Sequence, residues 1–286
     1  NKKSIHELFK SQVYLKSKFN RDDLPLFVLT DIEGCITPPN RSEISLEKLQ
    51  RLRSYMEFTQ ANSRFPRLVI YTGRSQGYVE LLAQSLGMLS FDTEVPCIIE
   101  NGAALYCPGV KKTLPLLSID KIKTIREMEF KLMNNFSSNT FEPKSYMVTI
   151  NPNESESVED LRQKVTLYLH EKGLDSGLNI TNTASAVDIT PQGIDKSTGL
   201  DAVIRNLYPD EDNKDAILQR VVGIGDHISD LPVLKRIGRP YCPTQNVHSE
   251  VRVYVETRTS NKNVIDKQHI DFVIEVLSRE CGLTIL

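Results

Sequence analysis

Residues 26–34 read Leu-Phe-Val-Leu-Thr-Asp-Ile-Glu-Gly, and they determine the expected fold. Four consecutive apolar residues are typical of a strand that is buried on both faces, as in a parallel sheet. The run ends on two carboxylates, Asp31 and Glu33. Side chains at positions i and i+2 of an extended chain point the same way, so both carboxylates can face one pocket. The same pair is also compatible with the capping of a turn.

Length, composition and charge exclude several classes of protein. The chain has 286 residues, 40% of them apolar, which is enough for one large domain or two ordinary ones. Its formal net charge is −2, so no overall field attracts nucleic acid or an anionic membrane. No stretch approaches the ~20 consecutive apolar residues of a membrane span. We therefore expect a globular protein with neither kind of partner, and the sequence carries no signal for its oligomeric state.

Cysteine usage and the first residues indicate the compartment. The five cysteines form no CxxC pair and no Cys/His cluster, which disfavours both a disulfide framework and a zinc site. A reducing cytoplasm is the expected location. The chain begins with Asn1 rather than Met, which indicates a trimmed or partial N-terminus.

Short apolar runs recur along the chain, and each closes on glycine or polar residues. They predict strands at residues 26–29, 68–71, 95–99, 221–224 and 251–255. Apolar residues at helical spacing predict helices after an N-cap at Ser45, around residues 79–86 and over residues 200–207. Strands and helices in alternation predict an α/β fold, a doubly wound parallel sheet. The first ~25 residues predict an extra amphipathic helix on this core.

The pattern changes in the middle of the chain. Two further helices and two strand segments are predicted there, at residues 119–133, 158–170, 145–150 and 178–190. Mixed β and α structure between two βα halves predicts an inserted α+β cap domain at residues 104–191. The core domain is expected to comprise residues 1–103 and 192–286. Asn101-Gly102 and Pro191-Gln-Gly193 are the expected hinges, because glycine and proline interrupt regular structure.

Ligands of an open parallel sheet bind beyond the carboxyl ends of its strands, and two segments there offer an anion site. Thr72 and Gly73 follow a predicted strand and precede a helix, so a hydroxyl and helix N-terminal amides can form an anion cradle. Thr-Gly is also common turn chemistry. Lys196 begins a predicted helix, where its charge opposes the helix dipole. A bound anion explains that placement, although a lysine at a helix start is often simply solvated.

A last segment adds carboxylates. Gly225-Asp226 ends another predicted strand, and Asp230 follows four residues later. Carboxylates gathered at strand ends fit a hard divalent cation such as Mg²⁺. His227 has no His or Cys companion in its segment and is interpreted as a loop residue. Together, the four strand-end segments supply the parts needed to bind phosphate and Mg²⁺ and to attack phosphorus with a carboxylate.

The order of these motifs resembles the haloacid dehalogenase (HAD) superfamily of aspartate-nucleophile phosphatases. The resemblance runs through the whole core, from Asp31 to Asp230. Residues 99–103, Ile-Glu-Asn-Gly-Ala, and residues 187–196, Val-Asp-Ile-Thr-Pro-Gln-Gly-Ile-Asp-Lys, look more narrowly like the Cof-type members with a C2B cap. Sucrose-phosphate, trehalose-phosphate and mannosyl-3-phosphoglycerate phosphatases belong to that branch.

The resemblance implies a role for each matching residue in the chemistry. Asp31 would be the nucleophile that forms an aspartyl-phosphate, and Glu33 would be the acid/base. Thr72, the Gly73 amide and Lys196 would hold the phosphoryl group.

It also implies a metal site and a role for the cap. Mg²⁺ would be bound by the Asp31 carboxylate, the Glu33 backbone carbonyl and Asp226, with Asp230 in support. The cap would close over the substrate and select it.

Two positions depart from the family pattern. Asp-x-Asp-Gly-Thr is Asp-Ile-Glu-Gly-Cys here, and the usual Asn of the last motif is Ser229. Glu33 has one more methylene than Asp, which moves its oxygens roughly 1 to 1.5 Å outward, a shift that matters for a catalytic group. Efficient turnover therefore depends on how the backbone accommodates Glu33.

The leading hypothesis is a Mg²⁺-dependent phosphomonoesterase for a small phosphorylated metabolite, a sugar phosphate or a glycosyl-phosphoglycerate. A sugar phosphomutase and a catalytically weak, phosphate-binding regulatory protein are the alternatives. In the cap, Asn182, Thr183 and Ser185 are candidates to bind sugar hydroxyls or are exposed strand residues. Basic residues there either favour an acidic substrate or form a solvated helix face; they are Lys111, Lys112, Lys121, Lys123, Arg126, Lys131 and Lys144.

Overall fold

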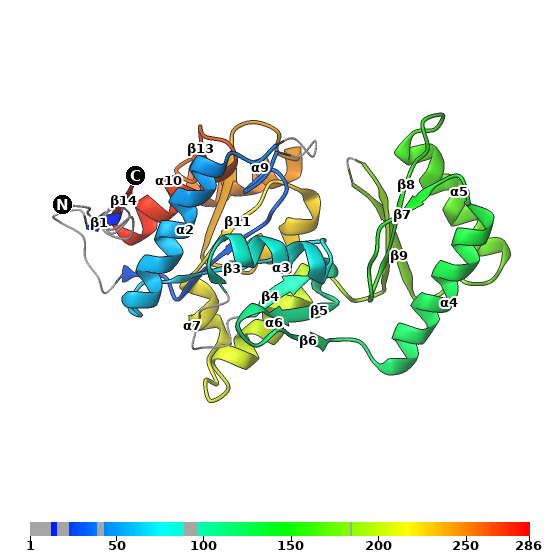
Figure 1. Cartoon of the computed structure of the whole chain (residues 1–286), viewed down its shortest axis with the longest axis horizontal. Coiled ribbons are helices and arrows are strands. Elements are labelled where there is room, and N and C mark those ends of the chain that lie inside the picture. The colour runs from blue at the N-terminus through cyan, green and yellow to red at the C-terminus, as the bar shows by residue number, and fades with distance from the viewer. Residues whose placement is uncertain (1–12, 16–22, 39–42, 89–95, 184) are drawn as a thin grey trace, which may run out of the picture.

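The computed structural model describes residues 13–15, 23–38, 43–88, 96–183 and 185–286, and the structural statements below refer to these residues. Figure 1 shows a larger core with a central sheet and, beside it, a smaller cap drawn in green. No helix in the described part of the chain is long and apolar enough to cross a membrane. All five cysteines are buried free thiols.

The central sheet of the core has five parallel strands in the order β13-β12-β11-β2-β3. This confirms the predicted α/β class. The strands are β2 (Phe27–Thr30), β3 (Arg67–Ile70), β11 (Val221–Ile224), β12 (Arg239–Pro243) and β13 (Val264–Ile265).

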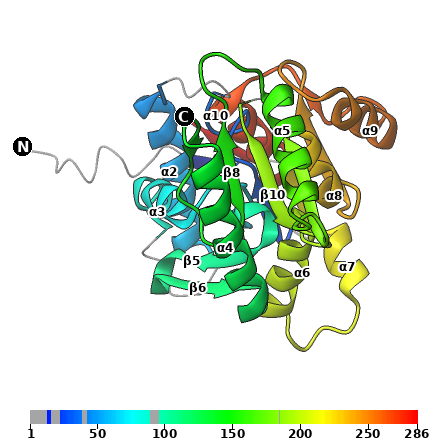
Figure 2. The same ribbon diagram turned by 90° about the vertical axis from the view of Figure 1, so that its right-hand side faces the viewer.

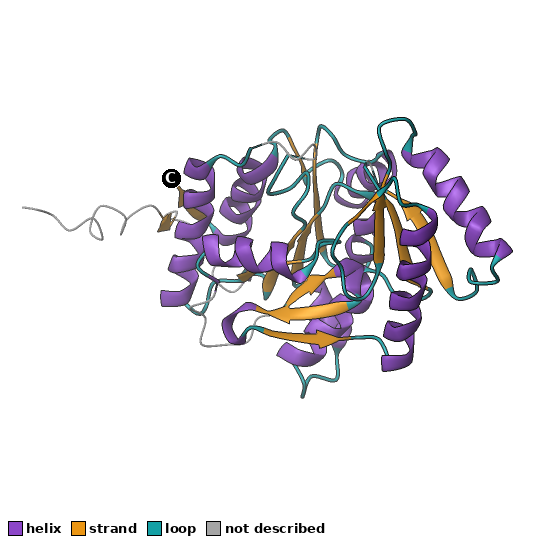
Figure 3. Ribbon diagram, turned by 45° about the vertical axis from the view of Figure 1, so that its right-hand side comes forward, coloured by secondary structure: helices purple, strands orange, loops and turns teal. Residues whose placement is uncertain are grey.

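Both faces of this sheet are buried because successive side chains of each strand point to opposite sides. In β2, Val28 belongs to one hydrophobic cluster, whereas Phe27 and Leu29 belong to the other. Figure 3 shows helices on both sides of the central strands. The first face is covered by α2 (Leu46–Ala61), α3 (Gln76–Ser85) and α10 (His269–Cys281). The second is covered by α6 (Lys196–Leu207), α7 (Lys214–Gln219), α8 (Leu231–Leu234) and α9 (Ser249–Thr259).

Residues 251–255, predicted as a strand, lie in α9, so that prediction is wrong. Val251 and Val255 are fully buried, while Val253 between them is 60% exposed. Burial at a spacing of four residues is helical, whereas a strand would bury all three on one face. The strand that the structure has in this region is β12, which precedes the helix.

The predicted N-terminal helix lies mostly outside the described residues. Its described part, β1 (Val13–Leu15), is a strand that pairs antiparallel with β14 (Leu283–Ile285), so the helix prediction is wrong there. Ser45 is the N-cap of α2, as predicted, and its hydroxyl accepts a hydrogen bond from the Lys48 amide.

A second sheet of the core is antiparallel and contains β4 (Cys97–Ile99), β5 (Ala104–Cys107) and β6 (Lys112–Pro115). The strand predicted at residues 95–99 is therefore present over its described part, and a bridge from Ile98 to Tyr71 joins it to the end of β3. Leu105 packs in a core cluster. We propose that the cap begins after β6 rather than at residue 104, since β5 and β6 pair with β4.

The cap is a four-stranded antiparallel sheet with the order β7-β8-β10-β9 and two helices on its outer face. Figure 2, in which the cap faces the viewer, shows α4 and α5 in front of β8 and β10. The elements are α4 (Ile119–Asn135), α5 (Val158–Glu171), β7 (Thr140–Phe141), β8 (Val148–Asn151), β9 (Leu178–Asn182) and β10 (Val187–Pro191).

Alternation along the cap strands sets which residues face the core. Val148, Ile150, Val187 and Ile189 pack with the cap helices. Thr149 and Asp188 lie between them in sequence, so they point to the opposite face, toward the core.

The turn at Gly102, between β4 and β5, touches the connection that returns from the cap to the core. This glycine has φ +88°, and a Cβ placed on it would lie 1.8 Å from the Asp195 carbonyl oxygen. Gly102→Ala is expected to lower the free energy of unfolding by about 3 kcal/mol through left-handed strain and overlap. Urea unfolding followed by circular dichroism measures the change.

Gly173→Ala is the matched control for that substitution. Gly173 also has positive φ, +62°, but nothing lies within 4 Å of the position that a Cβ would take there. For Gly173→Ala we expect the free energy of unfolding to fall only by the cost of the left-handed backbone, about 1 kcal/mol. Equal losses in the two variants would show that the close contact of Gly102 with the Asp195 carbonyl is unimportant for stability.

Candidate active site

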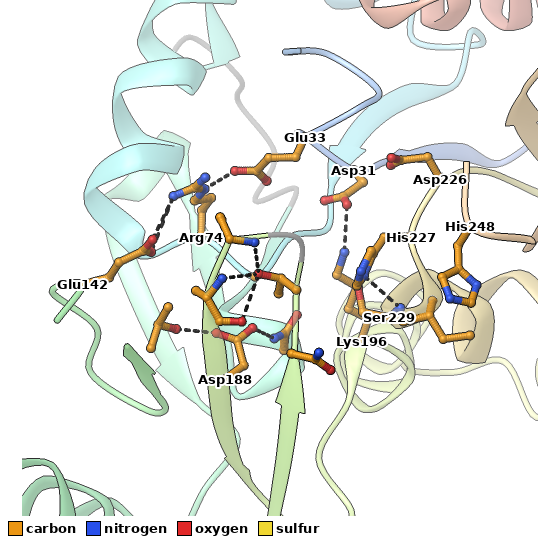
Figure 4. Close-up of a pocket in the computed structure, with 18 of the residues that line it drawn as sticks. Asp31, Glu33, Arg74, Glu142, Asp188, Lys196, Asp226, His227, Ser229 and His248 are labelled. Atoms are coloured by element: carbon orange, nitrogen blue, oxygen red, sulfur yellow. Dashed lines mark hydrogen bonds and ion pairs between the residues drawn. The ribbon is translucent and has the colours of Figure 1, made fainter. Parts of the chain in front are cut away.

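The carboxyl ends of β2, β3 and β11 meet the cap at a cavity of about 560 Å³. Figure 4 shows acidic and basic side chains converging on it from the core and from the cap. Residues from every strand-end segment predicted from the sequence line this cavity, including Asp31, Gly73, Lys196 and Asp226. Thr72 is fully buried and is not among its described lining residues.

Lys196 is the cation at the centre of the site. It is the first residue of α6, whose N-cap Asp195 accepts hydrogen bonds from the Ser197 and Thr198 amides. Its Nζ lies 3.0 Å from Asp31 Oδ2 and 2.6 Å from Asp230 Oδ1. Although burial alone lowers the pKa of this lysine, the two carboxylates raise it above its ordinary value. Lys196 is therefore a permanent positive charge next to Asp31.

Three carboxylates surround that lysine. Ligand oxygens of Asp31, Asp226 and Asp230 lie within 4.8 Å of one another, and all three residues are buried. Burial is the main cause that raises the pKa of Asp31 to about 7, and it also raises the pKa of Asp226. One lysine cannot balance three buried carboxylates, so the cluster fits a divalent cation.

Asp230 has its oxygens engaged by the protein. Oδ1 accepts from Lys196, and Oδ2 accepts from the backbone amides of Asp226 (3.0 Å) and His227 (2.9 Å). These bonds fix the loop after β11 and suit a supporting role for Asp230. Asp31 and Asp226 are the better placed residues to hold a cation directly.

The Gly-Cys pair after Glu33 allows Asp226 to approach the first loop. A Cβ on Gly34 would lie 2.1 Å from Asp226 Oδ2, and the φ of Gly34 is +74°. The Cys35 thiol donates to Asp226 Oδ1 at 3.5 Å. Burial, together with Asp226, raises the pKa of Cys35, so the thiol remains a donor.

The Thr-Gly segment after β3 is held by backbone bonds. The Thr72 amide donates to the Ile98 carbonyl at 2.9 Å, and Thr72 Oγ1 accepts from the Arg74 amide at 3.2 Å. Gly73 faces the cavity, where a Cβ would meet Asn101 Oδ1 at 3.0 Å. The glycine therefore keeps its backbone open to a bound anion.

Glu33 forms an ion pair with Arg74, a residue to which the sequence motifs assigned no role (Figure 4). Arg74 Nη1 also lies 3.4 Å from both oxygens of Glu142, a cap residue. Burial lowers the pKa of Arg74, but Glu33 and Glu142 raise it above its ordinary value. The extra methylene of Glu33 thus lets its carboxylate reach an arginine that bridges core and cap.

Two further contacts join core and cap. Glu100, which is buried and has φ +48°, accepts hydrogen bonds from the Ser145 and Tyr146 amides. Asn101 Nδ2 donates to Asp188 Oδ2 at 3.2 Å, and Thr149 donates to the other oxygen of Asp188 at 2.6 Å. These hydrogen bonds join the cap wall of the cavity to the core.

The cap residues that the sequence suggested as substrate contacts fall into two groups, those that line the cavity and those that do not. Asn182, Thr183 and Ser185 line the cavity. Lys144 also lines it, with a side chain only 4% exposed and Nζ 3.5 Å from Glu142. Arg126 instead donates to the carbonyls of Lys144 and Met147. The remaining basic candidates are exposed, namely Lys111, Lys112, Lys121, Lys123 and Lys131.

His227 has a companion that its own segment does not contain. Its ring centroid lies 6.3 Å from that of His248, and both residues line the cavity. His227 lies in the loop after β11, as interpreted from the sequence, but its companion comes from a distant segment. His248 precedes α9, the segment whose structure was mispredicted, so no local pattern in the sequence indicated this pair.

Comparison with known proteins identifies the fold. No protein-family model and no curated protein matches this sequence. Among solved structures, a haloacid dehalogenase-like hydrolase from Bacteroides thetaiotaomicron is similar with a TM-score of 0.63 and 18% identity, over 88% of this chain and 98% of that one. Sucrose-phosphatase from Synechocystis, solved with sucrose and phosphate, is similar with a TM-score of 0.59 and 14% identity, over 90% and 98%.

A second Bacteroides thetaiotaomicron protein, described among phosphatases of the haloalkanoate (HAD) enzyme superfamily, has a TM-score of 0.58 and 16% identity, over 93% of this chain and 99% of that one. The chain therefore has the fold of the haloacid dehalogenase-like hydrolases over nearly its whole length. The resemblance predicted from the strand-end motifs is confirmed at the level of the fold.

The acidic cluster predicts a metal-dependent stability. Mg²⁺ is expected to raise the free energy of unfolding by about 2.7 kcal/mol at a concentration about a hundredfold above its Kd. Asp226→Asn removes one carboxylate from the cluster and is expected to abolish this gain. Thermal unfolding with MgCl₂, against NaCl at equal ionic strength, measures it. An identical Mg²⁺ response in the variant would exclude Asp226 as a ligand.

Proposed function

We propose that this protein is a Mg²⁺-dependent phosphomonoesterase that works through an aspartyl-phosphate on Asp31. The observation that carries the proposal is the Asp31 carboxylate at the end of β2, 3.0 Å from the buried Lys196 and inside a cavity covered by the cap. A carboxylate nucleophile beside a fixed cation suits attack on an anionic phosphoryl group. The shared fold with HAD-superfamily phosphatases supports it.

Each residue has a defined step in this reaction. Asp31 attacks phosphorus, the ester P–O bond breaks, and Glu33, which leaves its ion pair with Arg74 and is protonated at this stage, gives a proton to the leaving oxygen. Water then attacks the aspartyl-phosphate and gives a proton to Glu33. This step releases phosphate and restores the Asp31 carboxylate. Lys196 and the amide of Gly73 hold the phosphoryl oxygens, and the Thr72 hydroxyl, which is buried and accepts from the Arg74 amide, fixes the loop that presents Gly73.

A cation held by Asp31 and Asp226, with the Glu33 carbonyl, supplies further neutralisation of the phosphoryl charge when bound. Asp230 orients the loop that carries Asp226, as its bonds to the Asp226 and His227 amides indicate.

The substrate is proposed to be a small phosphorylated metabolite, a sugar phosphate or a glycosyl-phosphoglycerate. A cavity of about 560 Å³ suits a molecule of this size. Polar cap residues, including Asn182, Thr183 and Asp188, offer hydrogen-bond partners for hydroxyl groups.

The test is release of inorganic phosphate from a panel of sugar phosphates and phosphoglycerates, with Mg²⁺ and with EDTA. Mg²⁺-dependent hydrolysis of at least one compound is expected. Binding of phosphate without turnover of any compound would instead indicate a phosphate-binding protein. Transfer of the phosphoryl group to a second sugar hydroxyl, with little free phosphate, would indicate a mutase.

Glu33→Gln is expected to lower steady-state turnover by about 10²-fold or more, because proton transfer to and from the substrate is lost. p-Nitrophenyl phosphate should still give a burst of one equivalent of p-nitrophenolate, since this leaving group needs no proton. The burst should be followed by slow hydrolysis of the aspartyl-phosphate. Stopped-flow absorbance measures both phases.

Glu142→Gln is the control for that variant. Glu142 shares Arg74 with Glu33 but lies in the cap, away from the proposed proton transfer. A loss below about tenfold and no burst are expected, because only a partly exposed charge pair changes. If Glu33→Gln turned over at the wild-type rate, Glu33 would not be the acid/base of the reaction.

A further inference from the structure

The proposed reaction does not use one wall of the cavity, which is formed by His227 and His248. Their rings are 6.3 Å apart with an interplanar angle of 72°. Figure 4 shows them next to each other, on the side of the cavity away from Arg74 and Glu142. Both residues line the same cavity as Asp31.

The hydrogen bonds of His227 assign its tautomer. His227 is the N-cap of the short helix η5 (Ile228–Asp230), and its Nδ1 accepts from the Ser229 amide at 3.3 Å. The Ser229 hydroxyl lies 3.1 Å from the same nitrogen. A ring nitrogen that accepts carries no hydrogen, so the hydrogen of the neutral ring is on Nε2.

His248 repeats this arrangement. It is the N-cap of α9, and its Nδ1 accepts from the Glu250 amide at 3.4 Å. Its own backbone amide donates to the Asp226 carbonyl at 2.7 Å, directly before His227. Each imidazole therefore bonds through Nδ1 within its own segment and keeps an Nε2–H as its remaining polar group, and the His248 backbone amide ties the two segments together.

With the hydrogen on Nε2, neither histidine is suited to bind a metal through that nitrogen or to have a charged ring. A metal bound at Nε2 would require the hydrogen on Nδ1, where it would face a backbone N–H donor. Protonation of the ring would create the same conflict. The pair is thus a set of two hydrogen-bond donors, each with its hydrogen on Nε2.

Two N–H donors are best matched by a ligand group that only accepts hydrogen bonds. A carboxylate fits this description better than a hydroxyl, because hydrogen bonds to a charged acceptor are stronger. Of the nearby acids, Asp230 accepts hydrogen bonds at both oxygens, from Lys196 and from the Asp226 and His227 amides, and Asp226 Oδ1 accepts from Cys35. The cap wall has the opposite character, since the Asp188 carboxylate accepts hydrogen bonds and suits hydroxyl groups.

We infer that His227 and His248 are specificity-determining residues that donate from Nε2 to a carboxylate on the leaving group. The preferred substrates are therefore phosphomonoesters of hydroxy acids, with hydroxyl groups toward the cap. This inference rests on the proposed phosphatase function and narrows its substrate class.

A matched pair of compounds tests the inference. D-Gluconate 6-phosphate and D-glucitol 6-phosphate differ at one carbon, which is a carboxylate in the first and a hydroxymethyl group in the second. The wild-type protein is expected to prefer the acid by at least about tenfold in kcat/KM, the factor of one charge-assisted hydrogen bond.

Two substitutions at each histidine separate recognition from folding. In His248→Asn the side-chain oxygen can still accept from the Glu250 amide, but the Nε2–H donor is lost. In His248→Gln the amide nitrogen can take the place of Nε2, while the cap is lost. The Asn variants of His227 and His248 are expected to reduce the preference for the acid to below about threefold, and the Gln variants to keep most of it.

Binding to the Asp31→Asn variant separates this inference from the proposed function. Isothermal titration calorimetry with the same two compounds gives their ratio of Kd values without hydrolysis. Suppose that neither the wild-type protein nor any variant hydrolyses a phosphomonoester, but D-gluconate 6-phosphate binds more tightly than D-glucitol 6-phosphate. The phosphatase proposal then fails and the histidine assignment stands. Binding of the acid no tighter than that of the polyol, including no binding of either, overturns the assignment. An unchanged preference in both Asn variants overturns it as well.

Discussion

Asp31→Asn is expected to lower the rate of phosphate release by at least about 10⁴-fold, as loss of a catalytic nucleophile does in other enzymes. The amide cannot form the acyl-phosphate through which the proposed reaction passes. The variant should still fold. Burial and nearby carboxylates raise the pKa of Asp31 to about 7, so a neutral side chain of the same shape is accommodated there. Phosphate release under Mg²⁺ and acid-quenched trapping of the phosphoenzyme measure the effect.

Asp210→Asn is the matched control for the nucleophile. Asp210 is exposed in the connection between α6 and α7, and the same change of charge there should leave turnover unaltered. Full activity in Asp31→Asn, or a trapped phosphoenzyme in that variant, would rule out Asp31 as the nucleophile. Loss of the folded circular dichroism spectrum would show that the charge is required for structure.

Lys196→Met is expected to produce the largest loss of stability. Lys196 is fully buried between Asp31 and Asp230, so its removal leaves buried carboxylates without a cation. Removal of one partner from a buried ion pair costs about 3–5 kcal/mol. Phosphatase activity should fall with it, because the cation next to the phosphoryl group is lost. Urea unfolding monitored by circular dichroism measures the stability.

Lys164→Met is the control, since Lys164 forms a similar pair with Glu156 at 2.8 Å but its side chain is 60% exposed. Solvent screens such a pair, so no measurable change is expected. If the two variants lost the same stability, the burial of the Lys196 pairs would not be what makes them important.

The fold was predictable where the pattern of apolar residues is local. Residues 26–29 and 221–224 are short apolar runs, and both are central parallel strands. The error at residues 251–255 arose because Val251, Val253 and Val255 fit a strand period as well as a helix period. Only packing against the sheet, which buries Val251 and Val255 and exposes Val253, distinguishes the two.

The candidate site was predictable in the same limited way. Asp31, Lys196 and Asp226 each stand at the end or start of an element, and the sheet brings them together as expected for parallel strands. Arg74 directly follows the Thr-Gly pair in sequence, but its partner Glu142 comes from the cap. No local pattern encodes a contact between residues so far apart in sequence.

The sequence by itself determined the parallel core and the order of the strand-end motifs, because apolar periodicity and turn residues act over a few positions. Tertiary structure alone decided three features: the ion pair of Glu33 with Arg74, the pocket-facing side of the cap sheet with Asp188, and the pairing of His227 with His248. Each depends on which surfaces meet when the chain folds and the cap lies on the core. Such contacts are set by packing and charge complementarity between distant segments. The spacing of residues along the sequence contains no information about them.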